Sequence, residues 1–148
     1  MTSINSNIQI ILAEDNQTTA DLTINAFRKS NVQNDIVHLT DGEELLNFIY
    51  DSVNVDENFI PILPKIILLD LKMPKINGIE VLNKLKKDEH TKHFPIIVLS
   101  SSDLESDIHQ CYELGANSYI VKPVNFTEFI NTIKDLSNYW LMLNKIVD

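Results

Sequence analysis

The stretch that decides the fold is residues 66–78, IILLDLKMPKING. Its first four residues are an unbroken apolar run, which is typical of a parallel strand covered on both faces. The run ends in one carboxylate, Asp70, and the following Pro74 and Asn77-Gly78 indicate a turn into a helix. Asp70 by itself has two interpretations: it starts the turn, or it performs chemistry at the end of the strand. The rest of the chain must decide between them.

Four more apolar stretches resemble this one, and helix-like segments follow each of them. Strands are expected over residues 8–13, 36–39, 66–69, 96–99 and 118–121. Helices are expected over residues 17–29, 43–50, 79–88, 104–114 and 126–144, with Gly115 ending the fourth. Strand followed by helix, five times over, indicates an α/β domain. We therefore expect a flavodoxin-like (βα)5 fold, a doubly wound parallel sheet with strand order 2-1-3-4-5.

The bulk composition narrows the class of protein. The chain has 148 residues, 44% of them hydrophobic, and a formal net charge of −9, which suits one globular domain. The negative charge argues against nucleic-acid binding, which requires clustered Lys and Arg. The single cysteine, Cys111, fits a reducing compartment, and no apolar run approaches the length of a membrane span. We expect a soluble protein in the cytoplasm, with no membrane partner.

Two segments carry apolar residues that the expected core does not clearly absorb. Residues 51–65 form a long connection before the third strand, which either packs on its own domain or meets a partner. In the last helix, Leu143 belongs to the apolar stripe, whereas Tyr139, Leu141 and Met142 fall off it. Exposed apolar surface indicates an interface, so a dimer is favoured over simple packing on the sheet.

Polar side chains follow the carboxyl ends of four of the expected strands, where ligands bind in an open parallel sheet. The strand order makes the first and third strands neighbours, which brings Glu14 and Asp15 beside Asp70. Three carboxylates in one cleft raise each other's pKa unless a cation lies among them, and Mg²⁺ prefers such oxygen ligands. Ser100 adds a hydroxyl and Lys122 an ammonium. This set suits transfer of a phosphoryl group to an aspartate.

The sequence around these polar residues resembles the receiver domains of response regulators in two-component signalling. LAEDN, LLDLKMP, VLSSS and SYIVKP stand in that family's order, with 30 residues from Asp70 to Ser100 and 22 from Ser100 to Lys122. The resemblance covers nearly the whole chain, which implies a single receiver domain over residues 1–148 and no output domain. Glu14 stands where many receivers have Asp, and Ser100 where Thr is commoner; both substitutions keep the chemistry.

The resemblance implies that Asp70 accepts a phosphoryl group from a histidine kinase. It also implies that Mg²⁺ is held by Glu14, Asp15, Asp70 and the backbone carbonyl of Lys72. The side chain of Lys72 projects near this site, and we expect it to affect the lifetime of the phosphoryl group.

Further roles follow from the same resemblance. Ser100 and Lys122 act as catalytic residues, each binding a phosphoryl oxygen. Ser100 and Tyr119 form a switch, in which the tyrosine ring turns inward as the hydroxyl is drawn to the phosphoryl group. The Lys122–Pro123 peptide bond is usually cis in the family, at the modest cost of a cis bond before proline.

The match is closer to the receivers that accompany bacterial and cyanobacterial phytochromes, which are photoreceptor histidine kinases. The long loop, LSSS, CYELGANSYIVKPVNF and the terminal YWL carry this similarity. It implies a sensor kinase, with a phytochrome as one candidate, and a homodimer through the fourth helix, fifth strand and fifth helix. The implied protein is a signalling phosphoacceptor that assists its own phosphotransfer and autodephosphorylation.

Three other functions compete with this one. A phosphatase of the haloacid dehalogenase type needs a second aspartate two residues after the nucleophile, where this chain has Lys72. A nucleotide or flavin binder needs clustered glycines, and the three glycines are 36 and 37 residues apart. A pseudo-receiver, which acts by binding alone, remains the alternative. The histidines lack metal-ligand spacing and are interpreted as structural or surface residues: His38, His90, His93 and His109.

Overall fold

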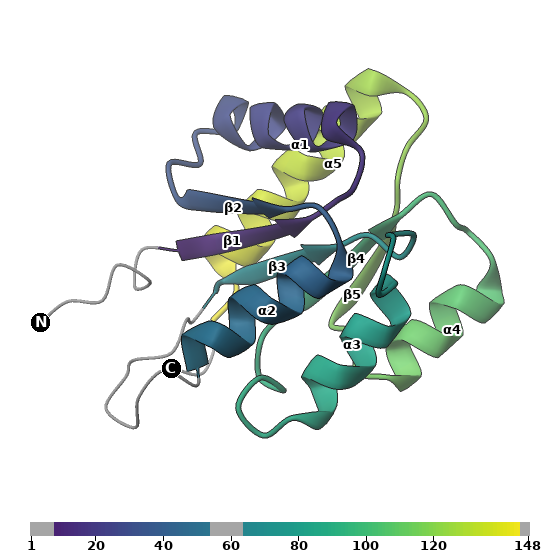
Figure 1. The fold of residues 1–148 in the computed structure, drawn as a ribbon. Helices are drawn as coiled ribbons and strands as arrows, with labels where there is room; N and C mark the ends of the chain where they lie inside the picture. The colour runs from purple at the N-terminus through teal and green to yellow at the C-terminus, as the bar shows by residue number, and fades with distance from the viewer. Residues whose placement is uncertain (1–7, 54–63, 146–148) are drawn as a thin grey trace, which may run out of the picture.

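The fold comes from a computed structural model that describes residues 8–53 and 64–145 (Figure 1). Five parallel strands form one sheet in the order β2-β1-β3-β4-β5. They are β1 (Ile8–Ala13), β2 (Asp35–Leu39), β3 (Ile66–Leu69), β4 (Ile96–Ser100) and β5 (Ser118–Val121). Every strand predicted from the sequence is present, with a difference of one residue at the start of β2 and at the end of β4. The doubly wound α/β fold is confirmed.

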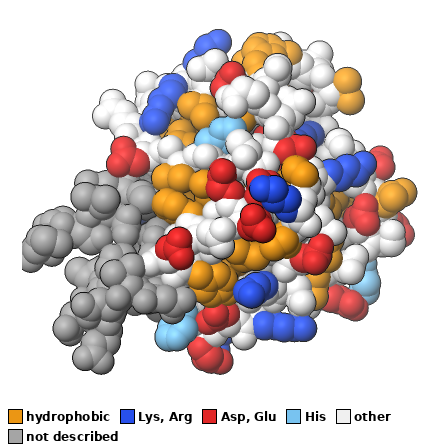
Figure 2. Space-filling model, in the orientation of Figure 1, with side chains coloured by type: hydrophobic (Ala, Val, Ile, Leu, Met, Phe, Trp, Pro, Cys, Tyr) orange, Lys and Arg blue, Asp and Glu red, His pale blue; other side chains and the backbone are white. Residues whose placement is uncertain are grey.

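Helices cover both faces of this sheet (Figure 1). One face carries α1 (Gln17–Lys29) and α5 (Phe126–Ser137), and the other carries α2 (Gly42–Val53), α3 (Gly78–Lys87) and α4 (Glu105–Glu113). Acidic and basic side chains are interspersed over the side seen in Figure 2, in which α2 and α3 lie toward the viewer. None of the helices described is long and apolar enough to cross a membrane.

The opening stretch of sequence builds the core on both sides of the sheet. Ile67 and Leu69 belong to the apolar layer under α2 and α3, whereas Ile66 and Leu68 belong to the layer under α1 and α5. Side chains alternate along a strand, so a strand covered on both faces must be apolar at every position. All four side chains are fully buried, and each contributes roughly 1.5–3 kcal/mol to the free energy of folding.

Helix ends follow the residue types that the sequence places there. The helices α1, α3 and α5 each begin with an asparagine whose side chain accepts a backbone N–H of the first turn: Asn16, Asn77 and Asn125. Gly115 has φ of +108° just after α4, the left-handed conformation that favours glycine at this position. The predicted turn at Asn77-Gly78 and the predicted helix end at Gly115 are confirmed.

The C-terminal helix differs from the prediction of one regular helix over residues 126–144. It continues from α5 into a π-helical segment, η2 (Asn138–Leu143), in which the Asn144 N–H donates to the Tyr139 carbonyl five residues back. This wider turn changes the face that each later side chain presents. Leu141 is 8% exposed and Leu143 is 62% exposed, so the predicted placement of these two leucines was wrong.

Helix α2 is longer than the sequence suggested. Helix α2 extends to Val53 instead of ending near residue 50. Residues 54–63, which hold most of the predicted apolar loop, lie outside the described residues. The question whether that loop packs on its own domain is therefore not tested.

Candidate functional site

The carboxyl ends of β1 and β3 bring three carboxylates together. The Asp70 N–H donates to the Ala13 carbonyl at 3.1 Å, so the two strands remain paired up to the site. One carboxylate oxygen from each of Glu14, Asp15 and Asp70 lies within 4.8 Å of the others. Glu14 and Asp70 are buried, whereas Asp15 is exposed. The acidic cluster predicted from the strand order therefore exists at this edge of the sheet.

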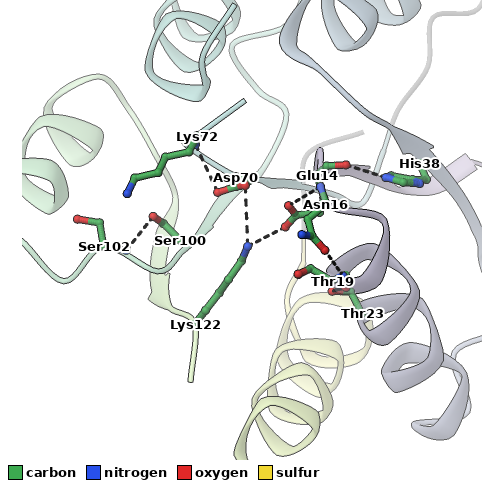
Figure 3. Close-up of polar contacts among 10 residues, drawn as sticks. All are labelled: Glu14, Asn16, Thr19, Thr23, His38, Asp70, Lys72, Ser100, Ser102 and Lys122. Atoms are coloured by element: carbon green, nitrogen blue, oxygen red, sulfur yellow. Dashed lines mark hydrogen bonds and ion pairs between the residues drawn. The ribbon is translucent and has the colours of Figure 1, made fainter. Parts of the chain in front are cut away.

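Lys122, just after β5, supplies a cation to two of these carboxylates, Glu14 and Asp70 (Figure 3). Its Nζ donates to Glu14 Oε1 at 2.7 Å and lies 3.9 Å from Asp70 Oδ2. The Lys122 N–H donates to the Ser100 carbonyl at 2.7 Å, which holds the start of this side chain beside β4. The ammonium therefore lies between two buried carboxylates that come from different strands.

Asp70 is electrostatically unfavourable as an anion in this setting. Burial raises the pKa of the Asp70 carboxyl from 3.8 to about 7, with Lys122 lowering it and the carboxylate of Glu14 raising it. One lysine is therefore not enough to compensate both buried carboxylates. A hard divalent cation fits the site because Glu14, Asp15 and Asp70 offer oxygen ligands within one small volume.

The loop after β3 holds the Asp70 backbone tightly. The Gly78 N–H donates to the Leu71 carbonyl at 2.9 Å, and a Cβ added at Gly78 would collide with the Asp70 carbonyl oxygen. The Lys72 N–H points to Asp70 Oδ1 at 3.4 Å, a long contact, while the Lys72 side chain is exposed. The role of the Lys72 carbonyl as a metal ligand stays a prediction.

Ser100 and Tyr119 are connected through the loop that follows β4. Ser100 is buried at the end of β4, and its Oγ accepts the Ser102 N–H at 3.1 Å. The Tyr119 hydroxyl donates to the Ser102 carbonyl at 2.9 Å. Both residues therefore contact the same short segment. The structure places Ser100 beside this segment rather than in a hydrogen bond with Asp70.

One residue-level prediction fails at the end of β5. The described residues contain no cis peptide bond, so the Lys122–Pro123 bond is trans and the expected cis bond was wrong. The trans form is intrinsically favoured before proline by about 0.5–1 kcal/mol. Lys122 still reaches the carboxylates from this trans backbone.

One histidine contacts the site without having been predicted to do so. His38 Nε2 lies 2.8 Å from the Glu14 carbonyl oxygen, a position that no sequence pattern indicates. A lone histidine in an alternating strand has no spacing signal, and only the register of β2 against β1 brings it to the end of β1.

Comparisons with known proteins agree with this geometry. The family model for the response regulator receiver domain matches residues 10–134. A probable methanogenesis regulatory protein, FilR2 of Methanothrix harundinacea, is 35% identical over 136 residues, which cover 92% of this chain and 85% of that protein. Response regulator Rcp1 of Synechocystis is 30% identical over 132 residues, covering 89% of this chain and 88% of its own.

Solved structures of response regulators have the same fold as this chain. The phosphorylated cyanobacterial phytochrome response regulator RcpA superposes with a TM-score of 0.84 at 32% identity, over 97% of this chain and all of its own. The Mn²⁺-bound form of Rcp1 gives a TM-score of 0.82 at 29% identity, over 95% of this chain and 99% of its own. With the five-stranded fold, the acidic cluster and Lys122 in place, the chain belongs to the receiver domains of response regulators in two-component signalling.

Proposed function

We propose that this receiver is switched by phosphorylation of Asp70, with a histidine kinase as phosphodonor and Mg²⁺ as cofactor. One observation carries the proposal: carboxylate oxygens of Glu14, Asp15 and Asp70 lie within 4.8 Å of one another, and Lys122 contacts two of these groups. Carboxylates this close, two of them buried, repel one another and cost stability when no cation is bound, so such a cluster is typical of a functional site.

In the proposed reaction, an Asp70 carboxylate oxygen attacks the phosphorus of a phosphohistidine. The new O–P bond forms as the N–P bond breaks, and the electron pair of that bond leaves with the imidazole. Mg²⁺, held by Glu14, Asp15, Asp70 and the Lys72 carbonyl, would neutralise charge on the phosphoryl oxygens. Lys122 turns from Glu14 toward one phosphoryl oxygen, and the Ser100 hydroxyl donates to another.

The output of the switch runs through Ser102. When the Ser100 hydroxyl turns to the phosphoryl group, the Ser102 N–H loses its acceptor, and the loop that also holds the Tyr119 hydroxyl must rearrange. Tyr119 lies on β5 at the edge of the sheet. Its movement changes the face formed by α4, β5 and α5, where we place the contact with a second copy of the chain.

A phytochrome is our candidate for the kinase, and the cytoplasm is where we expect the pair to meet. The similarity to RcpA, a cyanobacterial phytochrome response regulator, supports this choice. FilR2, a probable methanogenesis regulatory protein, names neither a kinase nor a light sensor and adds nothing to this choice. Return to the resting state would follow from hydrolysis of the aspartyl phosphate, which the same site assists.

The test is incubation with Mg²⁺ and acetyl phosphate or phosphoramidate, followed by intact mass measurement. We expect wild type to gain one phosphoryl group only with Mg²⁺, and Asp70→Asn to gain none. Asp103→Asn, which changes an exposed carboxylate in the β4–α4 loop, is the matched control and should react like wild type. If folded wild type binds Mg²⁺ and still forms no adduct, the chain is a pseudo-receiver instead.

A further inference from the structure

His38 contacts the metal site from outside the acidic cluster. It lies on β2, opposite Leu12 in the register with β1, and its Nε2 is 2.8 Å from the Glu14 carbonyl oxygen (Figure 3). A carbonyl oxygen has no proton to give, so the ring nitrogen must be the donor. The contact therefore requires a proton on Nε2.

This bond completes the anchoring of the Glu14 main chain by β2. The Glu14 N–H already donates to the Leu39 carbonyl at 3.0 Å. After Leu39 the chain leaves the sheet, because Asp41 caps the first turn of α2 with its side chain and carbonyl. The Glu14 carbonyl therefore accepts its hydrogen bond from the His38 side chain, at the point where backbone pairing between β1 and β2 ends.

Asp15 is the residue that depends most on this anchoring. The Glu14 carboxylate is held by Lys122 and by the Asn16 N–H, and Asp70 is held by Lys122 and Lys72. Within residues 8–53 and 64–145, Asp15 makes no hydrogen bond or ion pair. The backbone alone therefore sets the direction of the Asp15 Cα–Cβ bond, from which the carboxylate reaches the cluster, and the Glu14–Asp15 peptide plane includes the carbonyl that His38 holds.

We propose that His38 is a positioning residue for the divalent cation: by donating to the Glu14 carbonyl, it orients the Glu14–Asp15 peptide so that Asp15 can ligate. This inference rests on the metal site of the proposed function. Residues that orient ligands from outside the coordination shell typically change metal affinity by about 10–100-fold when they are replaced. His38 does not touch the cation itself in this arrangement.

Two substitutions at His38 separate orientation from simple packing. His38→Leu removes the donor, whereas His38→Gln retains an N–H donor at nearly the same distance from the backbone. We expect His38→Leu to weaken Mg²⁺ and Mn²⁺ binding by about tenfold, and His38→Gln to remain within about threefold of wild type. His93→Leu, at an exposed histidine in the α3–β4 connection, is the control.

The dissociation constants would be measured by calorimetry for Mg²⁺ and by electron paramagnetic resonance for Mn²⁺, well below each variant's unfolding temperature. Thermal unfolding in EDTA, run in parallel, reports any loss of stability without metal. A purely structural role predicts a lower unfolding temperature with unchanged affinity, and that result would overturn the inference. Equal loss of affinity in His38→Leu and His38→Gln would overturn it too.

A measurement on wild type guards against variants that do not fold. Long-range ¹H–¹⁵N correlations of the metal-free protein identify the ring nitrogen of His38 that carries the proton. We expect the Nε2–H form for His38, and an Nδ1–H form would exclude the contact. If wild type itself fails to bind Mg²⁺, the proposed function fails; if wild type binds and His38→Leu binds equally well, only the role of His38 fails.

Discussion

Asp70 should make the metal-free protein sensitive to pH. Its pKa is raised from 3.8 to about 7, chiefly by burial, so the folded state keeps a proton that the unfolded state releases above pH 4. Its contribution to stability is present at low pH and is lost as the pH rises through 7. Asp70→Asn, which cannot ionise, should therefore gain stability over wild type at pH 8 but not at pH 4, by on the order of 1–2 kcal/mol after solvent screening.

Urea unfolding in EDTA at both pH values measures this difference. Mg²⁺ should narrow the gap at pH 8, because the cation stabilises the ionised carboxylate of wild type and has less to bind in the variant. A gap of the same size at both pH values would contradict the shifted pKa.

Gly78 is a second residue on which the site depends. An added Cβ would collide with the Asp70 carbonyl oxygen and lie 2.6 Å from the Leu71 Cα, so Gly78→Ala must displace the phosphoacceptor loop. We expect a loss of about 1–3 kcal/mol in stability and slower phosphorylation by acetyl phosphate. Gly115→Ala is the control, since its φ of +108° makes alanine strained far from Asp70; it should lose stability and keep the phosphorylation rate.

Most residues of the site could be predicted from the sequence, whereas the His38 contact and the trans Lys122–Pro123 bond could not. Glu14, Asp70 and Lys122 each follow an apolar run, and the strand order that such runs imply brings their positions to one edge. The bond from His38 to Glu14 depends on side-chain rotation and on the exact register of β2, neither of which leaves a pattern in the sequence. The trans Lys122–Pro123 bond escaped prediction because the free-energy difference between its two forms is small.

The junction of α5 and η2 gives a prediction for one structural element. The π-helical turn buries Leu141 and exposes Leu143, although a regular helix would do the reverse. Leu141→Ala should therefore cost about 2–4 kcal/mol, whereas Leu143→Ala should stay within about 0.5 kcal/mol of wild type. Chemical denaturation of the two variants decides the matter, and the opposite ranking would mean that the regular helix is correct.

The elements that the sequence predicted best are those whose pattern has one interpretation. The strands are short apolar runs, and β3 and β4 are buried at every position. The predicted bounds of all five strands agree with the structure to within one residue. The C-terminal helix carries Tyr139, Leu141, Met142 and Leu143 almost consecutively, and such a cluster fits more than one helical phase. Packing decides which of these residues face the sheet, and in the structure Leu141 joins the apolar layer under α1 and α5.

For the whole molecule, the proposed homodimer predicts which surface side chains a second copy of the chain would cover. Tyr112 on α4 is 49% exposed, and its hydroxyl accepts the Tyr119 N–H on the outer edge of β5. It therefore belongs to the face of α4, β5 and α5 and contacts the backbone of the proposed switch. Tyr139, on η2, is 52% exposed and offers a nearly matched tyrosine on a different element.

If dimerisation uses the face of α4, β5 and α5, a new carboxylate at Tyr112 must be buried or must separate the subunits. Each copy already carries a net charge of −9, which adds repulsion. Tyr112→Glu should weaken self-association at least about tenfold, or roughly 1.4 kcal/mol, and Tyr139→Glu should change it less than about threefold. Analytical ultracentrifugation, with and without acetyl phosphate and Mg²⁺, measures both. Equal effects of the two variants would move the interface away from β5, and a monomeric wild type under both conditions would exclude the homodimer.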